Sequence, residues 1–160
     1  MQIKMKLKSL LIDPASNMPI IILRDETSEE VLPIWVGIFE ANAIAMQMEK
    51  ITSPRPMTHD LIKNILLGFH LNLEKIVIND LRESTFYATL HLKQNGSAHE
   101  IDARPSDAIA LALRTGAPIF VEKDVLEKAK NVDIRELSEA DRLRKWLENI
   151  DPKELGKYEM

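Results

Sequence analysis

The chain of 160 residues contains no cysteine, and this absence removes several kinds of chemistry. Disulfide bonds, thiolate nucleophiles and cysteine-based zinc or iron–sulfur sites are all excluded. A reducing, cytoplasmic environment is therefore the expected location. Long apolar runs are also missing, since none approaches the roughly 18 uninterrupted apolar residues that a membrane-spanning helix needs. We expect no membrane association.

Glycine is scarce, with five in the whole chain, and neither a P-loop nor a G-x-G-x-x-G pattern occurs. Nucleotide binding by a glycine-rich loop is therefore unsupported. A G-x-S-x-G element is missing as well, which weakens Ser106 as a nucleophile. The net charge of −4 argues against a broad basic groove for nucleic acid, although a small local phosphate site remains compatible with it.

The residues that are present describe a globular domain, with 45% hydrophobic and 29% charged residues. Periodicity predicts an α+β fold, in which a mostly antiparallel or mixed sheet has helices packed on one side, plus a peripheral C-terminal helix. Strands are expected at residues 3–7, 18–23, 31–36, 75–81, 85–93, 98–103 and 118–121. Helices are expected after Gly37 and at residues 58–67, 106–115 and 125–130. An apolar stripe of Leu143, Trp146, Leu147 and Ile150 marks the C-terminal helix.

Two arginine–proline pairs, each followed by a helix start, are the most informative feature of the chain. They are Arg55-Pro56 and Arg104-Pro105. Proline keeps the residue before it out of the helical region, so each arginine is expected to lie extended just outside a helix. Thr58 and Ser106 are the predicted N-caps, each with an acid in the first turn behind it. A guanidinium and free helix N–H groups together can hold a phosphate.

Several acids and one imidazole accompany these pairs and could carry hydrolytic chemistry. The candidates for catalysis are His59, Asp60, Asp80, Asp102 and Asp107, and the candidates for substrate binding are Arg55, Arg104, Thr58 and Ser106. Asp80, Asp102 and Asp107 could hold Mg²⁺ or Mn²⁺, as phosphodiester hydrolysis often requires. Alternatively, His59 serves as a general acid or base without a metal.

The same residues also have structural interpretations. Asp60 and Asp107 are suited to stabilising helix dipoles, and Asp80 to capping a turn. His59 is equally consistent with a surface or capping position. Both arginines could form ion pairs with Asp80 or Asp102 that join the sheet to the helices. At this point a phosphate site and a structural network both remain open.

Four ordered segments resemble the bifunctional nuclease family: residues 32–37 with Glu40, 54–61, 80–88 and 102–111. Residues 118–121 continue the resemblance, which covers roughly residues 4–130. It implies cleavage of both RNA and DNA, that is, DNase and RNase activity of a hydrolase on nucleic acid. The alternative function is a non-catalytic binding or regulatory module in which the arginine–acid network is structural.

The resemblance also predicts the domain organisation. Residues 1–130 correspond to the nuclease-like domain, and residues 131–160 to a helical extension and tail found in some bacterial members. The lysine-rich first strand, the half-apolar strand faces and the Trp146 helix predict exposed apolar surface that a partner copy could cover. We therefore expect a homo-oligomer, most simply a dimer.

Overall fold

The structure is a computed structural model that describes residues 1–131. The elements follow in the order β1 (Gln2–Ile12), β2 (Pro19–Asp25), β3 (Val31–Trp35), α1 (Ile38–Met48), α2 (Thr58–Gly68), β4 (Asn72–Arg82), β5 (Thr85–Gln94), β6 (Ser97–Ala103), α3 (Pro105–Thr115), β7 (Ile119–Glu122) and α4 (Lys123–Asn131).

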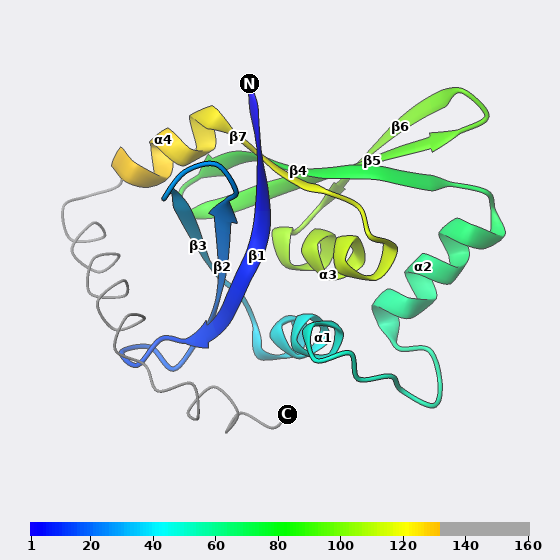
Figure 1. Cartoon of the computed structure of the whole chain (residues 1–160), viewed down its shortest axis with the longest axis horizontal. Helices are drawn as coiled ribbons and strands as arrows, with labels where there is room; N and C mark the ends of the chain where they lie inside the picture. The colour runs from blue at the N-terminus through cyan, green and yellow to red at the C-terminus, as the bar shows by residue number, and fades with distance from the viewer. Residues whose placement is uncertain (132–160) are drawn as a thin grey trace.

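The strands form one seven-stranded sheet in the order β3-β2-β1-β7-β4-β5-β6 (Figure 1). Neighbouring strands pair antiparallel except β4 and β7, which run parallel, with Val77 opposite Phe120. The short strand β7 therefore lies in the middle of the sheet, where it joins a three-stranded N-terminal half to a three-stranded second half. On its other side it pairs with β1, with Ile3 opposite Val121.

The turns follow from the local sequence. Asn95 and Gly96 have φ angles of 48° and 83° and connect β5 to β6. Two positive φ angles in a two-residue turn are what asparagine and glycine accept at little cost. The predicted hairpin at this position is confirmed.

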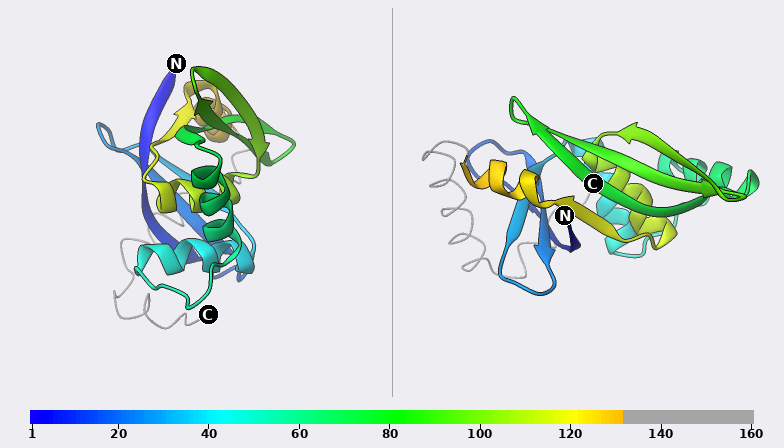
Figure 2. Two further views of the ribbon diagram at one scale, coloured as in Figure 1. Left: turned by 90° about the vertical axis from the view of Figure 1, so that its right-hand side faces the viewer. Right: turned by 90° about the horizontal axis from the view of Figure 1, so that it is seen from above.

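The helix α3 forms the centre of the core, and the twisted sheet wraps around it (Figure 2). All five residues from Ala108 to Ala112 are buried, so this helix is apolar on nearly every side. Small alanine side chains let the neighbouring helices α1 and α2 approach it closely. Beyond them, α4 contributes Val125 and Leu126 to the same cluster of buried residues.

The predicted fold class is confirmed: the chain is α+β, with a mixed sheet and helices packed against it. The strand β1 extends further than expected, to Ile12, and bends at an irregularity between Leu7 and Ser9. The predicted C-terminal helix with Trp146 lies outside the described residues. None of the helices within residues 1–131 combines the length and apolarity needed to cross a membrane.

The two predicted N-caps are wrong by one or two positions. Helix α2 already begins at Thr58, and its N-cap is Met57, whose N–H donates to the Asp60 carboxylate at 3.0 Å. Helix α3 begins at Pro105, with Arg104 as its N-cap. Proline is accepted at the first helical position because the N–H that it lacks has no partner there. Ser106 is consequently a buried residue inside the helix.

Candidate functional site

The first turn of α2 lies against α3 and makes two polar contacts with it. The consecutive residues His59 and Asp60 reach Asp107 and Arg114 of α3, respectively. Asp107 and Arg114 are seven residues apart, about two helical turns, so they lie on one stripe of α3. The two contacts therefore attach the start of α2 to both ends of the same helix face.

At the N-terminal end of α3, four side chains form a hydrogen-bonded chain that we call the Arg104 cluster: His59, Asp107, Arg104 and Glu40. His59 Nε2 lies 3.0 Å from Asp107 Oδ1. Arg104 Nε donates to Asp107 Oδ2 at 2.9 Å, and Arg104 Nη1 lies 3.0 Å from Glu40 Oε1. The side chain of Arg104 is nevertheless 65% exposed, so solvent reaches it beside its two carboxylate partners.

The Arg104 cluster joins the N-terminal turns of three helices. Glu40 belongs to the first turn of α1, His59 to that of α2 and Asp107 to that of α3. Each helix N-terminus carries partial positive charge from its unpaired N–H groups. Three such ends around one guanidinium favour anions, whether they are the protein's own carboxylates or those of a ligand.

Glu40 depends on Gly37 for its place in this cluster. Gly37 is the N-cap of α1, and a Cβ added there would collide with the Glu40 carboxylate. The glycine thus leaves room for Glu40 to fold back over the start of its own helix toward Arg104.

The ionisation of Asp107 decides which ring nitrogen of His59 carries a proton. Burial alone would raise the pKa of Asp107, but hydrogen bonds from Arg104 and His59 outweigh it and hold that pKa below its usual value. An ionised carboxylate only accepts hydrogen bonds, so His59 Nε2 carries a proton. In neutral His59 the free lone pair is therefore on Nδ1, and the carboxylate orients the ring.

At the other end of α3, Arg114 is a buried anchor, with its side chain 5% exposed. Its Nε donates to Asp60 Oδ1, and its Nη1 and Nη2 donate to the backbone carbonyls of Ala110 and Ala43, each at 2.9 Å. These bonds connect α2, α3 and α1. Hydrogen bonds from the Met57 N–H and from Arg114 outweigh the effect of burial and lower the pKa of Asp60.

A pocket of about 340 Å³ opens beside this anchor, between the end of α1, the following loop and α2. Asp60 and Arg114 form part of its wall, together with amide, hydroxyl and apolar groups: Met46, Gln47, Ile51, Thr52, Ser53, Pro54, Pro56 and Asn64. The proline-rich loop that precedes α2 thus lines the pocket, whereas the side chain of Arg55 is exposed and does not contribute to its wall.

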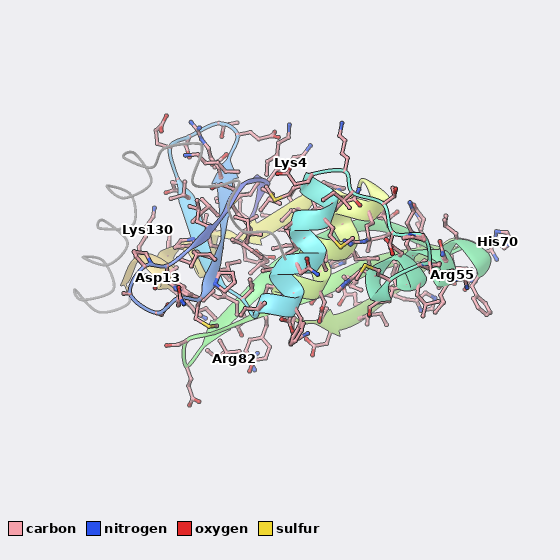
Figure 3. All side chains as sticks on the ribbon, turned by 90° about the horizontal axis from the view of Figure 1, so that it is seen from below. Lys4, Asp13, Arg55, His70, Arg82 and Lys130 are labelled. Atoms are coloured by element: carbon pink, nitrogen blue, oxygen red, sulfur yellow. The ribbon has the colours of Figure 1, made fainter. Side chains whose placement is uncertain are left out.

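Asp80 belongs to a different part of the surface. It accepts hydrogen bonds from Lys128 at 3.0 Å and from Arg82, which lower its pKa to about 2. The Arg82 guanidinium also lies over the ring of Tyr87, 4.9 Å from its centroid. Figure 3 shows Arg82 and Arg55 at widely separated places on the molecule.

The remaining candidates are dispersed. Thr58 and Asp102 are exposed, and neither Arg55 nor Asp102 has an ion pair among residues 1–131. The anticipated ion pairs of Arg104 with Asp80 or Asp102 are replaced by those with Asp107 and Glu40. Within the described part of the chain, no three His, Cys, Asp or Glu side chains gather as a metal site, so Asp80, Asp102 and Asp107 do not form one.

Comparison with known proteins identifies the family. A profile of the bifunctional nuclease domain matches residues 21–133. The chain belongs to the bifunctional nuclease domain family. An uncharacterized protein of Mycobacterium tuberculosis (strain H37Rv) is 34% identical over an alignment of 160 positions, which covers 93% of this chain and 95% of that protein.

Plant relatives of this family carry names that state an activity. Bifunctional nuclease 1 of Oryza sativa subsp. japonica is 26% identical over 116 residues, 71% of this chain and 35% of that protein. Bifunctional nuclease 1 of Arabidopsis thaliana is 29% identical over 116 residues, 69% of this chain and 35% of that protein. The matched region is thus about a third of each plant protein.

Sequence reasoning about this family member missed Arg114 altogether and gave Glu40 only a minor place. A signal for Arg114 exists, because it is the single basic residue of α3 and directly follows the apolar run of residues 108–113. A cation in a buried helix requires a partner, and Asp60 is that partner. The signal for Glu40 was its position in a first helical turn directly after a glycine.

Proposed function

We propose that this bifunctional nuclease domain hydrolyses phosphodiester bonds of RNA and DNA with little sequence preference, at the Arg104 cluster. Family membership supports the reaction class, because plant relatives of the same family are named nucleases. The observation that carries the choice of site is the exposed Arg104 guanidinium, surrounded by three helix N-termini and next to a histidine oriented by a carboxylate.

In this proposal Arg104 binds the phosphate. Of its five N–H donors, one on Nε bonds to Asp107 and one on Nη1 bonds to Glu40. The remaining donors are available to the oxygens of a phosphodiester, in a planar geometry that suits them. Such contacts go to the backbone of the nucleic acid and carry no base preference, in agreement with an activity on both RNA and DNA.

His59 is the proposed general acid or base. Asp107 holds the ring and keeps the proton on Nε2, so that Nδ1 can accept or return a proton. The side chain of His59 is 9% exposed, and Asp107 and Arg104 beside it are more open to solvent. Substrate would therefore approach from the side of Arg104, and because Nδ1 lies across the ring from Asp107, a water would carry the proton between Nδ1 and the substrate.

The Arg104 cluster could hold Mg²⁺ or Mn²⁺ only together with the substrate, which would supply the missing oxygen ligands. Glu40 and Asp107 supply two carboxylates, and Mg²⁺ sites commonly use one or two carboxylates together with substrate phosphate oxygens. Such an ion would neutralise charge that develops on the phosphate. Asp80 and Asp102 have no part in this arrangement.

The test uses the full chain with end-labelled single-stranded RNA and DNA, in the presence of Mg²⁺, Mn²⁺ or EDTA. We expect cleavage of both substrates and a loss of about 100-fold or more in rate for Asp107→Asn and for His59→Gln. Asp102→Asn is the matched control, because Asp102 flanks the same Arg-Pro pair but is exposed and makes no ion pair within residues 1–131.

An unfolding curve of each variant would show whether a loss of cleavage comes from a missing catalytic group or from an unfolded protein. Retained activity in folded Asp107→Asn and His59→Gln would overturn the assignment of the site. Activity that separates from the chain on a sizing column would overturn the nuclease function itself.

A second candidate function is a non-catalytic binding or regulatory module. One observation favours it: two carboxylates already neutralise Arg104, in a protein with a net charge of −4. This function predicts no turnover with either metal or with EDTA, and retained binding of a partner that does not depend on His59.

A further inference from the structure

The outer face of α2 carries a line of apolar side chains that no described element covers. Met57, Leu61, Ile65 and Phe69 follow each other at intervals of four residues, so they form one stripe along the helix. Their exposures are 38%, 53%, 47% and 66%. We call these four residues the α2 stripe. Figure 1 shows α2 at the right-hand edge of the molecule, with no element beyond it.

The α2 stripe lies on a face without charge. The other exposed residues of this face are Thr58, Asn64 and Gly68. His59 and Leu66, on the opposite side of the helix, are buried and supply its attachment to the core. The helix is thus apolar toward the core and apolar toward solvent. A solvated surface helix normally has charged residues on its outer face.

We propose that the α2 stripe is the contact surface of a homodimer, in which α2 packs antiparallel against α2 of a second copy. A line of residues spaced by four forms a ridge that fits into the matching groove of an identical helix. An antiparallel arrangement also places the positive N-terminal end of each helix next to the negative C-terminal end of the other. A twofold axis perpendicular to the two helices produces both relations.

The size of the surface agrees with a dimer. The four side chains of the stripe, at these exposures, offer on the order of 400 Å² of apolar area on each copy. Interfaces are about 60% apolar, so with a polar rim the total over both copies comes to roughly 1,300 Å², within the range of stable interfaces. The lack of charge excludes nucleic acid as the occupant, because phosphate binding needs cations.

The dimer leaves the Arg104 cluster open. His59 points from the buried side of α2, away from the stripe, so two copies joined at α2 would each retain their own cluster. The proposal therefore stands independently of the proposed nuclease activity.

The decisive variants place a charge on the stripe without harming the single chain. A Cβ at Gly68 meets no atom within 4 Å, so Gly68→Glu fits the isolated chain. Leu61→Glu replaces an exposed residue at the centre of the stripe. Ile101→Glu is the matched control, since Ile101 has a similar exposure of 48% but lies on the edge strand β6.

The measurement is the molar mass of the full chain by light scattering over a dilution series. We expect twice the 18.3 kDa of one chain for the wild type and for Ile101→Glu. Leu61→Glu and Gly68→Glu should each raise the dimer dissociation constant by about 100-fold or more, because they bury unpaired charge. Thermal unfolding of Gly68→Glu at concentrations where all variants are monomeric should match the wild type.

Three results would overturn the proposal. The first is a mass of one chain for the wild type at every concentration. The second is a dimer that Leu61→Glu and Gly68→Glu leave intact. The third is a dimer that dissociates in Ile101→Glu alone, which would assign the interface to the edge strand β6.

Discussion

The two ends of α3 each carry an arginine bound to a carboxylate, yet the two arginines differ in what they can do. Arg114 is enclosed, and each of its three nitrogens donates to a fixed protein oxygen. Arg104 makes two ion pairs but remains 65% exposed. A buried guanidinium is committed to the fold, because removing any partner leaves an uncompensated group. An exposed guanidinium can exchange its partners for a ligand at little cost to stability.

The difference also shows why an ion pair by itself says little about function. Arg114 pairs with Asp60 of α2, whereas Arg104 pairs with Asp107 of its own helix and with Glu40 of α1. What separates a structural pair from an available one is the exposure of the cation, and exposure depends on how α1, α2 and α3 pack. Four substitutions test this contrast, in order of decreasing expected effect.

Replacement of the buried arginine should have the largest effect on stability. Arg114→Leu removes three hydrogen bonds and leaves Asp60 without its cation, and we expect a loss of about 3 kcal/mol in the free energy of unfolding. Urea denaturation followed by circular dichroism measures it. The parallel substitution Arg104→Leu should cost less than about 1 kcal/mol. If Arg114→Leu and Arg104→Leu lowered the free energy of unfolding equally, the buried and the exposed arginine would not differ in their importance for stability.

The exposed arginine should instead govern activity. If the Arg104 cluster is the nuclease site, Arg104→Leu lowers the cleavage rate by about 100-fold, since it removes the charged donors from the phosphate. Arg55→Leu is the companion variant, because the side chain of Arg55 is exposed and lies outside the Arg104 cluster. Initial rates on one RNA substrate compare them. A greater loss at Arg55 would move the phosphate site to the loop before α2.

A smaller effect is expected from Gly37→Ala. The added methyl group displaces the Glu40 carboxylate, so Arg104 keeps only Asp107 as a partner. We expect a change of no more than about 1 kcal/mol in stability, together with a stronger salt dependence of substrate binding as the cluster loses a negative charge. Binding titrations at two ionic strengths measure this. Unchanged salt dependence would mean that Glu40 has no influence on the cluster.

The smallest effect concerns Asp80, which lies outside both ends of α3. Its pKa falls from 3.8 to about 2 in the folded protein, so the ionised carboxylate stabilises the fold above about pH 4. This stabilisation is lost as the pH falls from 3.8 through 2. Asp80→Asn should therefore lower the melting temperature slightly at pH 7, and the difference from the wild type should shrink toward pH 2. Asp124→Asn, an exposed acid at the start of α4, is the control.

Much of the fold can be predicted from the sequence, because it depends on patterns of neighbouring residues. Alternation predicted β5, the Asn95-Gly96 pair predicted the hairpin, and Arg104-Pro105 marked the start of α3. The parallel pairing of β4 with β7 was not readable, because it depends on strands some forty residues apart and on a β7 of four residues.

The candidate site could be predicted only in part, because it too depends on contacts between residues that are far apart in the sequence. The two Arg-Pro motifs that contain His59, Arg104 and Asp107 were singled out from the sequence, and the structure brings these three side chains together. Their neighbours Asp80 and Asp102 look equivalent in sequence, but the sheet places them elsewhere. The role of Arg114 needed the packing of α2 on α3, which no local pattern contains.

The central position of β7 has a consequence for how the protein is made. Residues 119–122 leave the ribosome after the rest of the sheet, yet they form its middle. Until they arrive, β1 and β4 each present an unpaired edge, and the growing chain consists of two separate half-sheets. Closing the sheet joins Gln2 to Glu122, so the decisive step of folding comes late and spans most of the chain. A chain that ends before residue 119 would therefore be prone to aggregate, and we expect the need for chaperones to be greatest before β7 has been made.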